Sequence, residues 1–302
     1  MTRTVTYVTE DQDGSNRQPA GMADQTDSLH FTRKGTINLV TGETSLEDWT
    51  AQDGTSFATL ENPVKKGYVV VAEESTDAVS SDLTKAGEHT GIHADAADIT
   101  DTVIYRPVGA YRISYATGKE PAHAQKEIPY LNDPTNPTAI LSPTAILSYV
   151  EGLEPKDARG QVLNLVDPLD ETKGYLLPSP ESPTVDTAIS YTITKGSVRV
   201  RFLTEGGDTD LQEAQDLATE VDFGTKYTSE APTEITKDGR IYHLVGHRAD
   251  SADPSGTVTK GMKTVIYDYK LATGTVIARF VIQDTSTELQ PELAVATNVD
   301  NG

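Results

Sequence analysis

The sequence predicts a mainly β protein made of small repeated units, with minor α+β elements. Short strands that alternate apolar and polar residues occur along the whole chain; in SVRVRF, for example, Val198, Val200 and Phe202 alternate with arginines. This period of two is typical of a strand with one buried face. Helical periodicity is scarce, and the best candidate, residues 211–223, also alternates, so we expect a strand there.

The alternating pattern returns four times along the 302 residues. Opening strands begin at Thr4, Ala110, Ser197 and Thr275, spaced 106, 87 and 78 residues apart, and polar or glycine-rich turns follow them. Each of the last three is preceded by a closing strand, with the sequences DTVIYRPVG, TAISYTITKG and KTVIYDYKLATG. Such self-similarity indicates small domains joined end to end. It predicts units at 1–107, 108–195 and 196–272, and a truncated start of a further repeat or a linker at 273–302.

Inside each complete unit, a turn is followed by a tyrosine and an apolar run, which predicts an interior strand. Tyr68, Tyr175 and Tyr242 occupy this step, and we expect them in the core because a shared fold repeats its core. For the fourth segment, we expect the last twenty residues to be poorly ordered without partner strands. The alternative is that residues 276–281 pair with the edge of the third unit.

Composition excludes several classes of protein. The net charge of −21 is spread over every segment and argues against nucleic acid as a partner. The absence of cysteine excludes disulfides and thiolate chemistry. No apolar run is long enough for membrane insertion, and no signal-peptide core follows Met1, so a secreted parent protein implies an internal fragment.

Catalytic signatures are missing from the sequence. It contains no G-x-S-x-G, P-loop or G-x-G-x-x-G pattern, and we expect the chain not to be an enzyme. Two histidine pairs have i, i+4 spacing: His89 with His93, and His243 with His247. The second pair lies in an apparent strand, where such residues are about 13 Å apart. We expect all four histidines to be exposed to solvent.

Acidic turns are the candidate metal sites. Asp11 and Asp13 lie in one turn and Asp208 and Asp210 in another, so oxygen ligands for calcium are present. However, Met22 stands where an EF-hand would need its bidentate glutamate. Aspartates in turns usually hydrogen-bond their own backbone, and this interpretation is favoured over calcium binding. We expect no other cofactor.

Trp49 is the single tryptophan and the candidate ligand-binding residue. A tryptophan face stacks on sugars and anchors interfaces, but it also fills small cores. We favour packing fully or partly in the core and keep ligand contact as the alternative.

Two stretches resemble modules of mucus-binding surface adhesins. The third unit resembles a MucBP-type domain in its opening strand, its acidic glycine turn, the step at 224–227 and its closing strand. The first unit resembles the first half of a Mub repeat from Gram-positive bacteria such as lactobacilli. The matching residues are Val40-Thr41-Gly42, Trp49, Pro63 and Gly67-Tyr68. The second unit would complete that repeat, although its stretch 134–152 is unusually rich in proline and alanine.

The resemblance implies ubiquitin-like β-grasp domains arranged as an elongated rod, extracellular and attached to the cell wall in the full-length parent. It also implies binding to mucin glycoproteins, with immunoglobulin binding in some members. Three functions stay open: a mucin-glycan adhesin, a module that captures immunoglobulin or another host protein at a sheet edge such as residues 198–202, and a spacer that binds nothing. The resemblance favours the first, and we expect a monomer.

Overall fold

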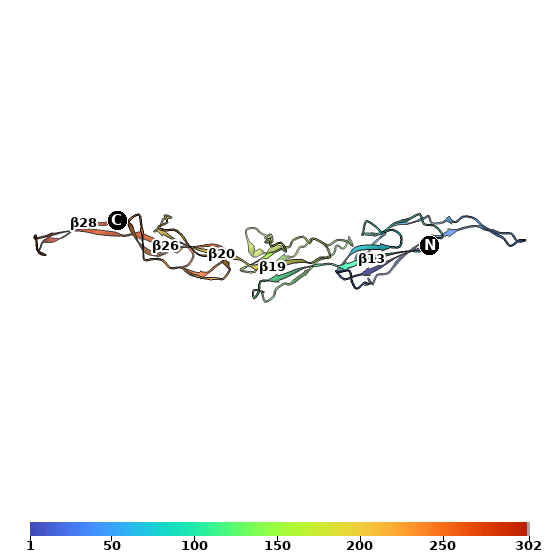
Figure 1. Cartoon of the computed structure of the whole chain (residues 1–302), viewed down its shortest axis with the longest axis horizontal. Coiled ribbons are helices and arrows are strands. Elements are labelled where there is room, and N and C mark those ends of the chain that lie inside the picture. The colour runs from blue at the N-terminus through green and yellow to red at the C-terminus, as the bar shows by residue number, and fades with distance from the viewer. Residues whose placement is uncertain (301–302) are drawn as a thin grey trace. The chain divides into compact units, whose positions relative to one another are not determined.

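The computed structural model describes residues 1–300 and confirms a mainly β protein (Figure 1). Among the described residues there is no α-helix, and the one helical element is the 3₁₀ turn η1 (Glu171–Lys173). Residues 301 and 302 of the predicted fourth segment lie outside the described part. The chain forms two compact units: one comprises Met1–Tyr149 and Pro155–Tyr191, and the other comprises Val150–Glu154 and the chain from Thr192 onward.

The first sheet is built on a parallel pair of strands, β1 (Thr2–Thr9) and β13 (Ile99–Pro107). In β1, Arg3, Val5 and Tyr7 are buried while the intervening threonines face outward, as alternation predicts. The other strands of this sheet are β2 (Gln18–Pro19), β3 (Gln25–Ser28) and β10 (Tyr68–Ser75).

Short strand pairs continue the first segment beyond its sheet. Near the core lie β8 (Ser56–Phe57) with β12 (His89–Thr90) and β9 (Leu60–Glu61) with β11 (Lys85–Ala86). Farther out, residues 31–51 form a long hairpin, here called the arm, which extends away from the sheet (dark to mid blue in Figure 1). Its strand pairs are β4 (Phe31–Thr32) with β7 (Thr50–Ala51) and β5 (Gly35–Ile37) with β6 (Thr44–Leu46).

The second sheet has the same parallel centre, made by β14 (Ala110–Tyr115) and β19 (Thr187–Ile193). The order of its strands is β15-β14-β19-β17, with β15 at Glu127–Pro129 and β17 at Leu153–Lys156. A separate pair is formed by β16 (Ile146–Leu147) and β18 (Tyr175–Leu176).

The third sheet again pairs its first and last strands in parallel, β20 (Lys195–Thr204) with β26 (Gly261–Leu271). Its order is β21-β20-β26-β24-β23. The flanking strands are β21 (Gln215–Asp222), β23 (Glu234–Lys237) and β24 (Arg240–His247), and β22 (Lys226–Thr228) pairs separately with β25 (Ser255–Thr257). The strand expected within 211–223 is therefore confirmed as β21.

Each closing strand carries a buried tyrosine that is hydrogen-bonded to another segment of the chain. Tyr105, Tyr191 and Tyr269 are at most 2% exposed, and each lies beside the last register position of its parallel opening strand. Each donates its hydroxyl to a backbone carbonyl, and the acceptors are, in order, Pro63, Ser148 and Pro232 at 2.5, 2.6 and 2.7 Å. Burial without such a partner would leave the hydroxyl unsatisfied, so the hydrogen bond and the core position depend on each other.

The first and second sheets are joined by hydrogen bonds as well as by the chain. The amide of Gly67 donates to the Asn132 side chain at 3.0 Å, and the amide of Val70 donates to the Pro137 carbonyl at 2.8 Å. At the link, a Cβ on Gly109 would lie 2.7 Å from the Val185 carbonyl oxygen, so only glycine fits there. These contacts fix the two sheets in one compact unit.

After the third sheet, β27 (Thr273–Val281) and β28 (Glu288–Asp300) form a long hairpin, here called the terminal hairpin (red in Figure 1). Within the described part of the chain, β27 pairs with β28 alone, so the alternative that residues 276–281 pair with the edge of the third sheet is wrong. The three tyrosines expected in the core differ in burial. Tyr175 is buried at 1% exposure, whereas Tyr68 and Tyr242 are half-buried at the margins of their cores.

Candidate binding site

The arm carries an exposed apolar tip. Leu39 and Val40 are 89% and 94% exposed, and the Asn38 side chain accepts the amides of Val40 and Thr41 to shape the turn. Gly42 follows with a φ of 72°, in the left-handed region that glycine favours. The Val40-Thr41-Gly42 motif is thus the turn at the end of the arm.

Trp49 lies on the arm and is 47% exposed, so the expectation that it packs in the core is wrong. The reason is tertiary: the two- and three-residue strands of the arm form isolated pairs, with no larger sheet or second layer to cover the indole. The guanidinium of Arg33 lies 4.5 Å from the centre of its ring, a cation–π contact that covers one face. Ligand contact by Trp49 stays a prediction.

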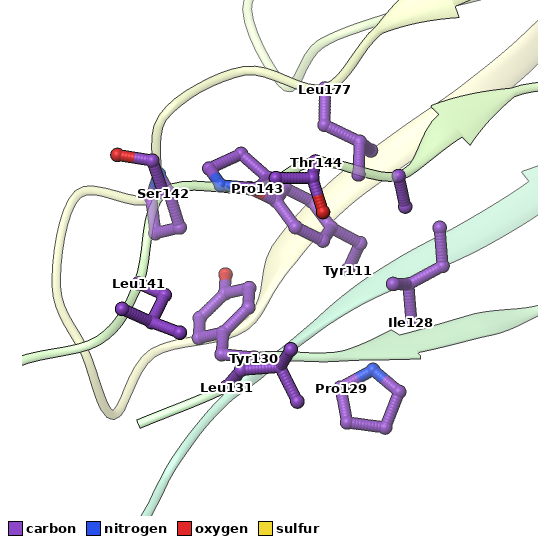
Figure 2. A pocket seen from close by; sticks show the side chains of 12 residues that line it. Tyr111, Ile128, Pro129, Tyr130, Leu131, Leu141, Ser142, Pro143, Thr144 and Leu177 are labelled. Carbon is purple, nitrogen blue, oxygen red and sulfur yellow. The ribbon is translucent and has the colours of Figure 1, made fainter. Parts of the chain in front are cut away.

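A more enclosed site lies in the second sheet, where a cleft of about 110 Å³ opens between β14, β15 and the loop 141–145 (Figure 2). Its walls are mostly aromatic, aliphatic and proline side chains and include no charged residue. The lining residues that the argument uses are Tyr111, Tyr130, Leu131, Leu141, Pro143 and Thr144.

The two cleft tyrosines are held rigidly by their hydroxyls. Tyr111 donates to the Pro178 carbonyl at 2.7 Å, and Tyr130 lies 2.6 Å from the Thr187 hydroxyl and 3.0 Å from the Val185 carbonyl. Burial raises the pKa of Tyr111 to about 12. The raised pKa keeps the phenol of Tyr111 neutral. The two rings also pack edge to face with their centres 5.0 Å apart, so the cleft is preformed.

The rim of the cleft is exposed and apolar, with Leu131 at 65% and Leu141 at 44% exposure. Thr144 projects toward the tyrosines in Figure 2, and its hydroxyl has no hydrogen-bond partner among the described residues. A largely apolar surface with the hydroxyls of Ser142 and Thr144 suits a neutral ligand that has an apolar face, such as a sugar ring. It offers nothing to balance a negative charge.

Sequence reasoning missed this cleft, although its signal was visible. The stretch 134–152 departs from the family pattern by its proline and alanine content, and it supplies the loop 141–145 that closes the cleft. Prolines are disfavoured in the interior of a sheet, so this segment stays outside the ladder and forms a wall beside it.

The acidic turns are occupied by contacts within the chain. Asp11 accepts from Asn16 at 2.5 Å and Asp13 from the Ser15 amide at 2.9 Å. These hydrogen bonds to Ser15 hold the pKa of Asp13 below its usual value. Asp13 therefore adopts the side-chain-to-backbone pattern of a turn, and Asp11 accepts from a side chain of the same turn.

The second acidic turn is tied to the third sheet by arginines. Asp210 forms a two-bond ion pair with Arg201 at 2.8 and 3.0 Å, which lowers the pKa of Asp210. Asp208 is 91% exposed at its side chain and lies 3.8 Å from Arg248. Among residues 1–300, no group of three or more His, Cys, Asp or Glu side chains is arranged to hold a metal. Calcium binding at Asp11, Asp13, Asp208 and Asp210 stays a prediction.

His89 is buried at 1% exposure, so the expectation that all four histidines face solvent is wrong for this residue. Its Nδ1 lies 2.8 Å from Asp77, and its Nε2 lies 3.1 Å from both oxygens of Asp101. Asp101 in turn accepts from the buried Arg3 at 2.7 Å. Arg3, Asp101, His89 and Asp77 therefore form one hydrogen-bonded chain of polar side chains in the interior of the first segment.

Comparison with known families decides what kind of chain this is. Residues 1–109 match the model of the Muc B2-like domain, and residues 197–270 match the model of the MucBP domain. The chain carries a Muc B2-like domain and a MucBP domain. The expected resemblance to mucus-adhesin modules is therefore confirmed, and both are adhesion-type domains rather than enzymes.

Among solved structures, the chain is similar to the crystal structure of the MucBP domain of the adhesion protein from Pediococcus pentosaceus. The identity is 25%, and the match covers 35% of this chain and 98% of that chain with a TM-score of 0.24. No curated protein matches the chain. No helix within residues 1–300 has the length and apolar character needed to cross a bilayer.

Proposed function

We propose that this chain is a repeat segment of an extracellular, cell-wall-attached adhesin that binds the glycans of host mucins. The observation that carries the proposal is the presence of two adhesion-type domains in one chain, a Muc B2-like domain and a MucBP domain. The parallel pairing of the first and last strands in each sheet also supports the β-grasp interpretation of these modules.

The cleft in the second sheet is the place where we propose that a sugar ring binds. Tyr111 and Tyr130 are fixed, the rim leucines are exposed, and Thr144 supplies a hydroxyl. One such site would be weak, and repetition along an adhesin would raise its avidity.

Charge decides which mucin sugars the cleft favours. The cleft has no cationic side chain, and the chain carries a net charge of −21. Both features disfavour an anionic sugar, so neutral sugars are the proposed ligands. Removal of sialic acid should therefore preserve or strengthen binding, and added salt should reduce the repulsion from sialylated mucin.

The test is binding to immobilised mucin, to mucin stripped of its glycans and to immunoglobulin, each with and without sialidase. Leu141→Asp places a charge in the cleft, and Leu176→Asp is the matched control because Leu176 is 48% exposed and lies outside it. We expect binding to intact mucin that is lost after stripping and in Leu141→Asp but retained in Leu176→Asp.

Other outcomes assign other functions. Immunoglobulin binding that ignores sialidase would make the chain a host-protein binder, as the open β-strand edges allow. If the chain bound stripped mucin as well as intact mucin, it would be a protein binder that recognises the mucin polypeptide. A folded chain that binds none of the targets would be a spacer.

A further inference from the structure

The terminal hairpin repeats the strand pairing of the first hairpin of the third sheet. With an offset of 78 residues, all five pairs of β20 with β21, and both of their register shifts, recur in β27 with β28, which continues for two further pairs. Thr273↔Asp300, Gly274↔Val299 and Val276↔Ala296 correspond to Lys195↔Asp222, Gly196↔Val221 and Val198↔Ala218. Bulges are specific features of a fold, so their repetition shows that the two hairpins share one design.

The two hairpins differ in what covers them. Val198 and Phe202 in β20 are 0% and 1% exposed, whereas their counterparts Val276 and Phe280 in β27 are 52% and 42% exposed. The apolar surface of the terminal hairpin continues along β28, where Leu293 is 57% exposed. Apolar residues in these positions are costly unless another element packs on them.

The third sheet shows which element provides this cover. β26 pairs with β20 in parallel, placing Val265 beside Val200 and Tyr267 beside Phe202. The ring of Phe202 lies 6.2 Å from that of Tyr267 and 6.3 Å from that of Tyr269. An alternating valine-tyrosine strand therefore closes both the hydrogen-bonding edge and the apolar face.

We propose that β27 is a strand acceptor, whose open edge binds an extended segment with the chemistry of the chain's own closing strands, in parallel orientation. The sequence of these closing strands is restricted, because β13 and β26 share the residues TVIY, at 102–105 and 264–267. Addition of a strand satisfies the free backbone groups of the edge, and the alternate side chains supply specificity. The segment lies beside β27 as β26 lies beside β20, with Tyr267 of the segment opposite Phe280.

The absence of cysteine allows a direct test of binding and direction. In the full chain, Gln283→Cys puts one thiol in the turn that follows β27. Two peptides with the sequence of residues 261–271 carry a cysteine at the N-terminus or at the C-terminus, supplied as its mixed disulfide with glutathione, so that attack by the thiolate at position 283 releases glutathione. Parallel binding brings only the C-terminal cysteine next to position 283, so that peptide should form the protein–peptide disulfide roughly tenfold faster or more, by effective concentration.

Two second-site variants control for folding and for reactivity. Phe280→Asp places a charge on the proposed face and should make the two rates equal. Leu39→Asp changes an exposed leucine of the arm and should leave the preference intact. Equal rates in Gln283→Cys alone, a preference for the N-terminal cysteine, or a preference that survives Phe280→Asp would each overturn the proposal. The outcome is independent of mucin binding, so the proposed function stands or fails separately.

Discussion

At equivalent buried positions, the first sheet has charged side chains and the third sheet has apolar ones. Counted back from the tyrosines Tyr105 and Tyr269, Asp101 of the first sheet occupies the place of Val265 in the third. Arg3 likewise occupies the place of Val198. All four of these side chains are 0% exposed.

The surroundings explain the difference. Val198 and Val265 belong to a compact apolar core, in which burial alone favours the fold. Arg3 instead donates to the carbonyls of Ala58 at 2.6 Å and Gly87 at 2.7 Å, in the segments that carry the short strands at the base of the arm. The comparison teaches that a buried polar network can take the place of apolar side chains in this fold and at the same time bind the backbone of a long insertion.

Breaking the network should give the largest effect. Asp101→Ala leaves the Arg3 guanidinium and the His89 ring buried without their shared partner, and we expect a loss of about 3–5 kcal/mol. Hydrogen exchange resolved by segment is the suitable measurement, because a chain of several sheets need not unfold in one step. Protection should fall across β1, β13 and the segment 76–90 while the third sheet stays unchanged. An unchanged first sheet would contradict a structural role for the network.

The matched change in the third sheet should cost less. Val265→Ala removes two methyl groups from an apolar core and leaves no polar group unsatisfied, so we expect about 2 kcal/mol. The same exchange measurement should show the loss in β20, β24 and β26. If Val265→Ala cost as much as Asp101→Ala, the two centres would not differ in the way that their contacts indicate.

Acid should act on the first sheet through Glu10. Its hydrogen bonds to Arg17 and Arg106 hold the pKa of this buried carboxyl below its usual value of 4.5. A depressed folded pKa gives stability above the unfolded value, and this stability is lost as the pH falls through the folded value. We expect Glu10→Gln to cost about 1 kcal/mol or less at neutral pH. The variant and wild-type curves should converge in acid, and a constant difference down to pH 2 would contradict this assignment.

The smallest effect is expected at Trp49. The indole is half-exposed and touches Arg33 on the arm, so Trp49→Ala should change stability by no more than about 0.5 kcal/mol. Because stability is spared, the variant isolates the question of ligand contact. Reduced binding to mucin with unchanged exchange protection would make Trp49 a contact residue, and unchanged binding would leave the cleft as the proposed site.

Much of the fold could be predicted from the sequence because strand alternation is a local signal. The repeated opening and closing strands and the strand at β21 follow from period-two patterns such as Val198, Val200 and Phe202. The site was less predictable. The cleft depends on a proline-rich loop that folds beside β14 and β15, and no local pattern specifies that approach.

The sequence by itself determined the mainly β class and the repetition, because these depend on residue type and spacing alone, and its resemblance to known modules indicated the adhesin type. Only the tertiary structure decided that Trp49 is exposed, that His89 is buried between Asp77 and Asp101, and that β27 has an open edge. The physical reason is that burial is a property of what packs against a residue. For His89 those partners, Asp77 and Asp101, come from other segments of the chain.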